Sequence, residues 1–438
     1  MSKYIKSIEA MPSNLHLWGS LPTQTSIREV KRIDFYPISS VESSDTIDFI
    51  IPKIPKLMLD KVEILTKIRV LNANGTNPTA KNNVSVVSDL SGALWRNVDV
   101  SIGGVSITQS FDNSYTMSHF WDTVLHNRIA TQHLMFQKEG LLLDHVTDKT
   151  GSENFVYYPV AVDNKTPAVV NKNGKLRADR IAQGATVTIL SNLNVSLFTQ
   201  EKLLPSDIAI NISLTKNYPE FILLSDATKT EKVTFDKVIL QCTFHRPNDI
   251  MLNVIEERLA KSAATYHADK SVLTFQNISE GAQDLTFDNL FIGDLPYFFL
   301  VGVQDRSAYA KTRNKNPFTY HRFNKITMFL DGVEYFPKPV EFEGDNHGVM
   351  YHSFLESIGY INGGDTLING YYKPHQVMGF DLTQDNSQNQ THLNLKRNGS
   401  VRVKLTLPQA AGQNLVLMVL AYYERIIEIN KDREVIII

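Results

Sequence analysis

The order of apolar and polar positions along the chain predicts mostly β-strands. Residues 208–214 alternate apolar with small or polar side chains, and residues 401–407 alternate in the same way. Period-two alternation is typical of a strand with one face buried and one face in solvent. Two continuous apolar runs, 297–301 and 415–421, are too short to cross a membrane. They predict strands that are covered on both faces.

Three segments have helical periodicity instead. In residues 114–128 the apolar side chains recur at the spacing of one helix face, and these are Met117, Phe120, Trp121, Val124 and Leu125. A second helix is predicted over residues 248–261, capped by Asn248 or Asp249. A third is predicted around residues 350–358.

Two patterns recur in the same order in the two halves of the chain. The strand–glycine turn–strand pattern at 98–107 resembles the one at 326–335, at an offset of 228 residues. The alternating pattern at 184–193 resembles the one at 399–408, at an offset of 215. Nearly equal offsets favour two copies of one β-domain, and chance similarity between hairpins is the alternative. Jelly rolls of eight strands in two facing sheets fit this size and strand content.

A chain of 438 residues is also too long for one ordinary core. We therefore expect an all-β protein with a few short helices, built from two similar β-sandwich units, and two tandem eight-stranded jelly rolls are an arrangement that fits them. The expected divisions are an N-terminal arm at 1–27, a first jelly roll at 28–227 and a second at 228–438. The long polar segments are expected to be loops, and these are 72–83, 146–180, 306–316 and 384–398.

Charge and cysteine content limit the functions open to the chain. Lys and Arg number 44 against 46 Asp and Glu, for a net charge of −2. This balance argues against a surface that binds nucleic acid throughout, so we expect genome contact to be weak or indirect. Cys242 is the only cysteine, which excludes an intrachain disulfide and a cysteine-based metal cage. The first residues lack the apolar core of a signal peptide, and no apolar run has the length of a membrane-spanning helix.

The residue spacing does not point to catalysis. His119 and His126 lie seven apart without a carboxylate or cysteine at a ligand spacing, so packing or exposure is favoured over metal binding. The His-X-His set of a cupin-type enzyme is missing from the sequence. An acidic cluster could bind a hard cation, although a solvated loop is favoured; its members are Glu341, Glu343 and Asp345. We expect no enzyme activity, cofactor or metal, and a jelly-roll hydrolase with two convergent carboxylates is the enzymatic alternative.

An ordered series of motifs in the second half resembles a family of viral capsid proteins. The motifs are Gly293 with Leu295-Pro296, Val301-Gly302-Val303, Asn316-Pro317-Phe318, Asp331-Gly332, Gly379-Phe380-Asp381-Leu382 and the closing YYERIIEINKDREV. In the first half, VVSDLSGALWRNVDVSIGG looks similar, with Trp95 where family members commonly carry Phe. The series is similar to the hexon-like double jelly-roll major capsid proteins of Polinton/Maverick-type and adintovirus-like elements.

This resemblance implies a double jelly roll, a fold of two tandem eight-stranded jelly rolls, in a structural protein without catalytic residues. It implies a homotrimer of pseudo-hexagonal outline that assembles an icosahedral shell, with penton or minor capsid proteins as partners. It places the protein in the virion, with assembly in the host cell, and the hexon-like relatives imply the nucleus. The alternative is a trimeric β-sandwich surface protein that binds carbohydrate or a receptor, which should show a fibrous or coiled segment.

Several segments are candidates for contacts between subunits. The arm at 1–27 and the tail at 425–438 are candidate clamps across subunits, and the loops at 72–83, 146–180, 306–316 and 384–398 are candidate contacts. The basic side chains within 311–315 could contact a neighbouring subunit or nucleic acid, with a solvated loop as the alternative. The last four residues, 435–438, are all apolar, so we expect them to be paired or buried.

Overall fold

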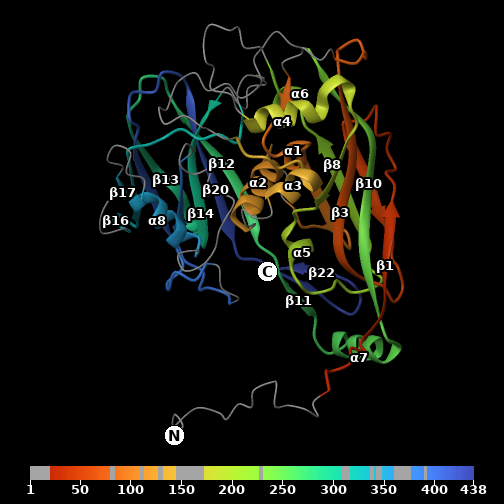
Figure 1. Ribbon diagram of the computed structural model, residues 1–438. Coiled ribbons are helices and arrows are strands. Elements are labelled where there is room, and N and C mark those ends of the chain that lie inside the picture. Colours follow the sequence, from red (N-terminus) through yellow and green to blue (C-terminus); the bar gives the residue numbers. More distant parts are fainter. Residues whose placement is uncertain are drawn as a thin grey trace, which may run out of the picture.

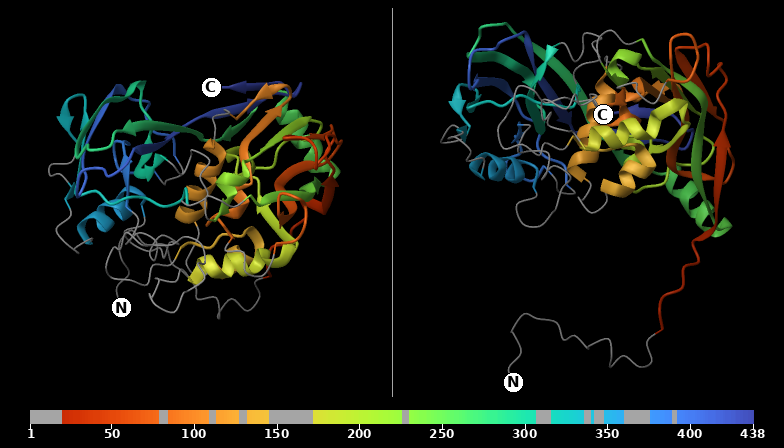
Figure 2. Two further views of the ribbon diagram at one scale, coloured as in Figure 1. Left: turned by 90° about the horizontal axis from the view of Figure 1, so that it is seen from above. Right: turned by 45° about the horizontal axis from the view of Figure 1, so that its top comes forward.

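Two β-barrels lie side by side in the computed structural model, with a group of helices between them (Figure 1). The structure describes residues 20–78, 84–108, 113–126, 132–144, 172–225, 230–306, 316–335, 340–341, 348–359, 376–388 and 392–438. Seen from above, the first barrel and the second lie at opposite ends of the molecule (Figure 2). Residues 20–26 lead away from the base of the first barrel, beside a helix that begins at residue 249.

The first barrel consists of two facing four-stranded sheets. One sheet has the order β1-β10-β3-β7 and the other the order β2-β8-β5-β6. The strands are β1 (Ile27–Phe35), β2 (Thr46–Ile51), β3 (Met58–Leu71), β5 (Trp95–Ile102), β6 (Val105–Ser106), β7 (Val187–Asn192), β8 (Ile210–Lys216) and β10 (Lys232–Pro247). A short pair lies beside them, β4 (Ser85–Val86) with β9 (Leu223–Leu224).

The second barrel repeats this arrangement strand for strand. Its sheets have the orders β12-β20-β14-β18 and β13-β19-β15-β16, with β17 (Val340–Glu341) on β15. The strands are β12 (Lys270–Ile278), β13 (Asp284–Asp294), β14 (Phe298–Asp305), β15 (Lys325–Leu330), β16 (Val333–Glu334), β18 (Val377–Asp381), β19 (Asn398–Thr406) and β20 (Leu415–Tyr423). When the eight strands of each barrel are numbered 1 to 8 in chain order, both barrels have one sheet with the order 1-8-3-6 and one with the order 2-7-4-5. This order confirms the double jelly roll.

The pairing of β10 moves the division between the two units. This strand pairs with β1 and with β3, and Cys242 lies between Ile33 and Val62. It is therefore the eighth strand of the first jelly roll, and that unit ends after residue 247, not at residue 227. In the sequence, the polar stretch at 225–231 therefore lies between β9 and β10 and does not separate the two units. The prediction placed the division there because a linker between domains and a loop between strands have the same polar composition.

One of the two internal matches is right and the other is wrong. The segments 98–107 and 326–335 contain β5-β6 and β15-β16, which occupy the same positions in their barrels. The segments 184–193 and 399–408 contain β7 and β19, which are the sixth and the seventh strands. The counterpart of β19 is β8. β7, β8 and β19 all alternate buried and more exposed side chains, so this alternation could not show which strand of the first barrel corresponds to β19.

Helices are more numerous than the sequence patterns indicated. They are α1 (Leu90–Ala93), α2 (Ser114–His126), α3 (Gln132–Glu139), α4 (Lys172–Ile181), α5 (Ser196–Thr199), α6 (Pro219–Ile222), α7 (Asp249–Leu259) and α8 (Gly348–Ser357), with a 3₁₀ turn at Ala182–Gly184. All three predicted helices are present, and the side chain of Asn248 caps α7 by accepting a 2.7 Å hydrogen bond from the Met251 N–H. The segment 146–180, expected to be a loop, contains most of α4. Among the described helices, none combines the length and hydrophobicity that a membrane crossing needs.

The two continuous apolar runs form strands covered on both faces, as predicted. All eight residues of β14 are buried, and in β20 only the last residue is not. One face of their sheet faces the core of the second barrel. The other face is covered by elements of the first half, which join the same hydrophobic cluster.

The end of the chain returns to the first barrel. A three-stranded sheet has the order β11-β21-β22, from β11 (Ala264–His267), β21 (Ile426–Ile429) and β22 (Val435–Ile437). Ile427, Ile429 and Val435 belong to the core cluster of the first barrel. The last four residues are therefore paired, as predicted, but only Val435 is buried and Ile436 to Ile438 are exposed.

Candidate functional site

The contact between the two barrels is built around helix α2. Its apolar stripe, predicted from spacing, belongs to the core cluster of the second barrel and not to that of the first. Met117, Phe120 and Trp121 are completely buried. Burying one large apolar side chain contributes about 1.5–3 kcal/mol. The stripe therefore holds the first half of the chain against the second.

Aromatic rings carry this contact across the interface. Phe120 stacks on Phe318, with ring centroids 4.6 Å apart. Trp121 packs against Tyr320 and donates a 2.8 Å hydrogen bond from Nε1 to its hydroxyl. Burial raises the pKa of the Tyr320 hydroxyl far above its ordinary value, so this group stays protonated.

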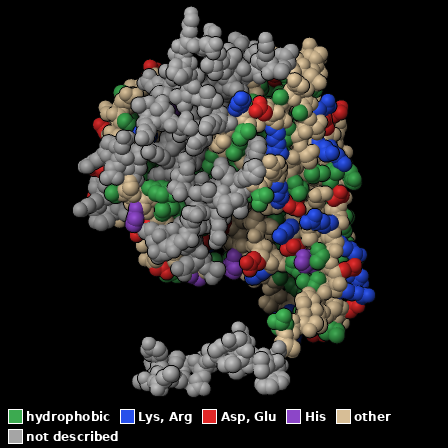
Figure 3. Space-filling view, viewed as in Figure 1, with side chains coloured by type: hydrophobic (Ala, Val, Ile, Leu, Met, Phe, Trp, Pro, Cys, Tyr) green, Lys and Arg blue, Asp and Glu red, His purple; other side chains and the backbone are tan. Residues whose placement is uncertain are grey.

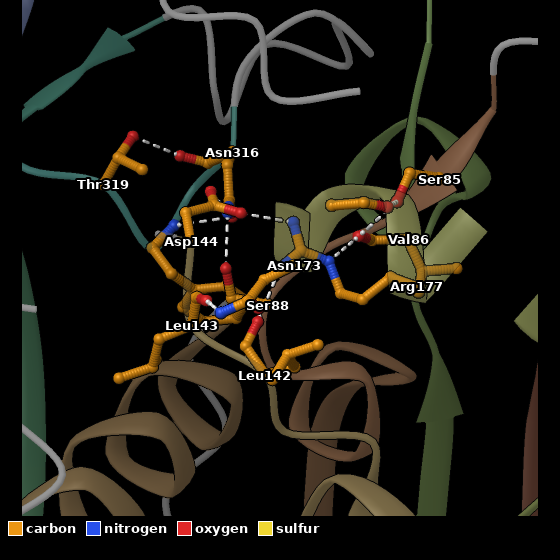
Figure 4. A network of polar contacts seen from close by, with 12 residues as sticks. Ser85, Val86, Ser88, Leu142, Leu143, Asp144, Asn173, Arg177, Asn316 and Thr319 are labelled. Atoms are coloured by element: carbon orange, nitrogen blue, oxygen red, sulfur yellow. Dashed lines mark hydrogen bonds and ion pairs between the residues drawn. The ribbon is translucent and has the colours of Figure 1, made fainter. Parts of the chain in front are cut away.

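A buried polar network lies beside the rings and joins both halves (Figure 4). Asn316, from the second half, donates from Nδ2 to Ser88 Oγ at 2.6 Å and to Asp144 Oδ2 at 2.7 Å. Asp144 also forms an ion pair with Arg177 of α4. Arg177 donates further to the carbonyl of Val86 at 2.8 Å.

This network fixes the geometry of the contact more than it adds stability. Asn316, Asp144 and Arg177 are each at least 97% buried. A buried ion pair gains little net energy, because removing both charges from water offsets their attraction. Removing one partner leaves a buried polar group unsatisfied, which costs about 1–3 kcal/mol and more for a charge. The hydrogen bonds of this buried network are therefore all formed in only one relative position of the two barrels.

The C-terminal segment crosses in the opposite direction. Arg425 donates from Nη1 to the carbonyl of Ile107 at 2.7 Å, and Arg433 donates from Nε to the carbonyl of Ser206 at 2.8 Å. Gly103 accommodates this segment, because a Cβ there would lie 3.0 Å from the carbonyl oxygen of Arg433. Its φ of +58° also favours glycine. Each half of the chain thus packs a segment into the core of the other.

A buried ion pair supports α2 from the first barrel. His119 Nδ1 lies 2.8 Å from Asp89 Oδ2, and both side chains are at most 3% exposed. Burial by itself would lower the pKa of His119, but the neighbouring carboxylates, Asp89 first and then Glu139 and Asp122, together outweigh it and raise that pKa to about 9. Asp89 also caps α1 by accepting a hydrogen bond from the Gly92 N–H. The imidazole is therefore charged at neutral pH.

The motif residues fall into two groups. Asn316 and Phe318 lie in the contact, and the carbonyl of Pro317 accepts a 2.7 Å hydrogen bond from Gln304. Gly302 makes room for the contact, because a Cβ there would lie 2.5 Å from the ring of Tyr320. The remaining positions lie within the second barrel: Gly293, Pro296, Gly332, Phe380 and Asp381.

Those remaining positions have local structural roles. Phe380 stacks on Phe299 with centroids 5.0 Å apart, and Asp381 accepts hydrogen bonds from the N–H and hydroxyl of Thr383. Gly293 and Gly332 have positive φ, and a Cβ at either position would meet nothing within 4 Å. Backbone conformation, not space, therefore favours glycine at both. Pro296 is buried in the connection between β13 and β14.

Several expected sites are placed only in part. Glu341 pairs with Lys325 at 2.5 Å, whereas Glu343, Asp345, the basic residues 311–315 and the arm residues 1–19 lie outside the described residues. In the part of the chain that the structure describes, no group of three or more His, Cys, Asp or Glu side chains could hold a metal ion. Burial raises the pKa of the Cys242 thiol to about 12, so it stays protonated.

The fold is similar to that of solved viral capsid structures. A chain in the cryo-EM structure of the Sputnik virophage matches with a TM-score of 0.64 and 11% identity, over 99% of this chain and 93% of that chain. The Faustovirus major capsid protein matches at 0.59 and 8%, over 94% and 92%. The mavirus major capsid protein matches at 0.58 and 11%, over 100% and 96%. No protein-family model matches the sequence, and no curated protein matches it.

Replacing Asn316 tests the polar network. We expect Asn316→Ala to lower the free energy of unfolding by about 2–4 kcal/mol, because Ser88 and Asp144 lose a shared donor in a buried site. Urea denaturation measures this, with Asn253→Ala on the exposed face of α7 as the control. A loss no larger than that of the control would contradict the role given to Asn316.

The His119–Asp89 pair predicts a loss of stability at alkaline pH. The folded-state pKa of about 9 lies above the ordinary 6.5, so the stabilisation is complete below about pH 6.5 and is lost as the pH rises through about 9. We expect unfolding free energy to fall by up to about 3 kcal/mol between pH 6.5 and 9.5. Denaturation at several pH values should show a flatter profile for His119→Gln. Equal slopes for the two proteins would rule out this pair as the cause.

Proposed function

We propose that this chain is the major capsid protein of a virus, a structural subunit that assembles an icosahedral shell. The observation that carries the proposal is the pair of jelly rolls with identical strand order, held in one relative position by segments that each half packs into the other. The similarity to capsid structures over at least 94% of the chain supports it.

The two similar barrels suit a lattice with local sixfold packing. Three chains, each with two barrels, present six similar units around one axis, which a single barrel achieves only with six chains. A fixed angle between the barrels is necessary for this, because a hinge would spread neighbouring contacts over many geometries. We infer a homotrimer as the building block.

The outer surface has features that a partner subunit would cover. Large apolar side chains are exposed on both barrels, including Ile50, Ile292, Val333 and Leu395. Basic and acidic side chains are mixed along the side that carries β1 and β10, in the right part of Figure 3. Obligate interfaces of this kind bury about 2,000–5,000 Å². Mixed charges favour specific contacts between subunits over binding of a genome along the whole face.

Other parts of the proposal rest on the resemblance alone. The protein would reside in the virion beside penton or minor capsid proteins, after assembly in the host cell. Nuclear assembly is carried over from hexon-like relatives. The loops at 72–83, 146–180, 306–316 and 384–398 and the arm at 1–27 are candidate contacts between subunits. The tail at 425–438, also expected to clamp a neighbouring subunit, packs on the first barrel of its own chain instead.

The alternative is a trimeric surface protein that binds carbohydrate or a receptor. It shares the β-rich fold and the trimer, but it would not form a lattice. The hydrolase alternative requires a pair of free carboxylates in a cleft. Asp122 and Asp269 line a cleft between the barrels. Each accepts a hydrogen bond from a tyrosine of the second barrel, so neither carboxylate is free.

Assembly of the purified chain separates these functions. We expect the protein expressed alone to form trimers by mass photometry, and the trimers to tile into hexagonal arrays or closed shells by electron microscopy. Trimers that stay separate at high concentration would favour the surface protein. A stable monomer would contradict the capsid proposal.

A further inference from the structure

A cavity of about 890 Å³ lies where the two barrels meet. Its volume is in the range of about 300–1,000 Å³ that is typical of small-molecule sites. One wall is the polar face of α2, opposite its apolar stripe, and includes Tyr115, His119 and Asp122. The facing wall comes from the second half and includes Tyr297 and Arg425. Neither the assembly proposed above nor the packing of the barrels uses this space.

His119 provides a hydrogen-bond donor that has no partner in the described part of the chain. Its side chain is 3% exposed and lines the cavity. Nδ1 is taken by Asp89, whose carboxylate holds that edge of the ring. Nε2 lies on the other edge and has no hydrogen bond among the described residues. Because the ring is charged at neutral pH, Nε2 carries a proton that it can donate to a ligand.

Three carboxylates line the same cavity as this donor. Glu139 is 4% exposed and lines the same cavity, paired only loosely with Lys138 at 3.6 Å. Asp122 and Asp269 are the other carboxylates of the wall. Side chains with amide or hydroxyl groups also line the cavity, and these include Asn192, Asn194, Ser196, Thr199, Ser271 and Gln388.

Positive and negative side chains are equal in number around the cavity, and this balance favours a neutral ligand. The cationic side chains of the wall are His119, Lys138, Lys270 and Arg425. The acidic ones are Asp122, Glu139 and Asp269, with Asp89 directly behind His119. A polyanion or a polycation would face as much repulsion as attraction. A hydroxyl group both donates and accepts, so a neutral polyhydroxylated molecule matches a lining that contains donors and acceptors together.

We propose that the cavity between the barrels binds a short neutral saccharide, held by His119 and Glu139 from the first half and by side chains of the second. The aromatic side chains Tyr297 and Phe298 offer apolar surface for the ring faces of a sugar. Binding would link the two barrels through the ligand as well as through α2. The proposal does not depend on whether the chain forms a shell.

Saturation-transfer NMR of the full chain tests the proposal with lactose, maltotriose and N,N′-diacetylchitobiose, each at about 10 mM, a concentration that reveals even weak affinity. We expect signal transfer to at least one of them. Titration calorimetry with that saccharide should then show about fivefold or greater weakening in Glu139→Gln, which removes one charged acceptor with little change of shape. Lys270→Gln is a second cavity variant.

Glu257→Gln is the matched control, because Glu257 is an exposed glutamate of α7 that does not line the cavity. Transfer to none of the three saccharides would overturn the proposal. Binding with equal affinity in both cavity variants would place the sugar elsewhere and would also overturn it. Assembly is observed separately by microscopy, so a failure of saccharide binding and a failure of shell formation are distinguishable.

Discussion

The burial of one helix face in a neighbouring core is the constraint on which the rest of this structure depends. Helix α2 is encoded in the first half of the chain, but Phe120 and Trp121 lie in the core cluster of the second barrel. The sheet that they cover has strands that are apolar on both faces and could not remain in solvent. The second barrel therefore requires the first, and the two form one body instead of two domains on a linker.

The return of the chain end makes this dependence mutual. Ile427, Ile429 and Val435 complete the core of the first barrel after the second has been built. In addition to these two packed segments, the Asn316–Asp144–Arg177 network fixes a single relative position of the two barrels. Any shift of one barrel against the other would leave buried polar groups without partners. Fixed geometry between two similar barrels is the property that a closed lattice requires, and it links the packing to the proposed function.

The sequence patterns predicted the fold because the strands and helices of each jelly roll have recognisable local patterns of apolar residues. Continuous apolar runs marked β14 and β20, and helical spacing marked α2 and α7, since burial on one or both faces leaves its period in the residues. Pairing was harder: the division at 228 and the match of 184–193 with 399–408 failed because strands that alternate look alike whatever their partners are. Asp144, Arg177 and the His119–Asp89 pair had no local signal, because their partners lie 30 or more residues away.

Calorimetry of the purified chain tests the central claim that the two barrels are one cooperative unit. If each half completes the core of the other, neither can unfold alone, and heating should give a single transition whose calorimetric enthalpy equals its van't Hoff enthalpy. Two resolved transitions, or a calorimetric enthalpy near twice the van't Hoff value, would mean that the barrels unfold independently. That result would contradict the account, whatever larger assembly the chain forms.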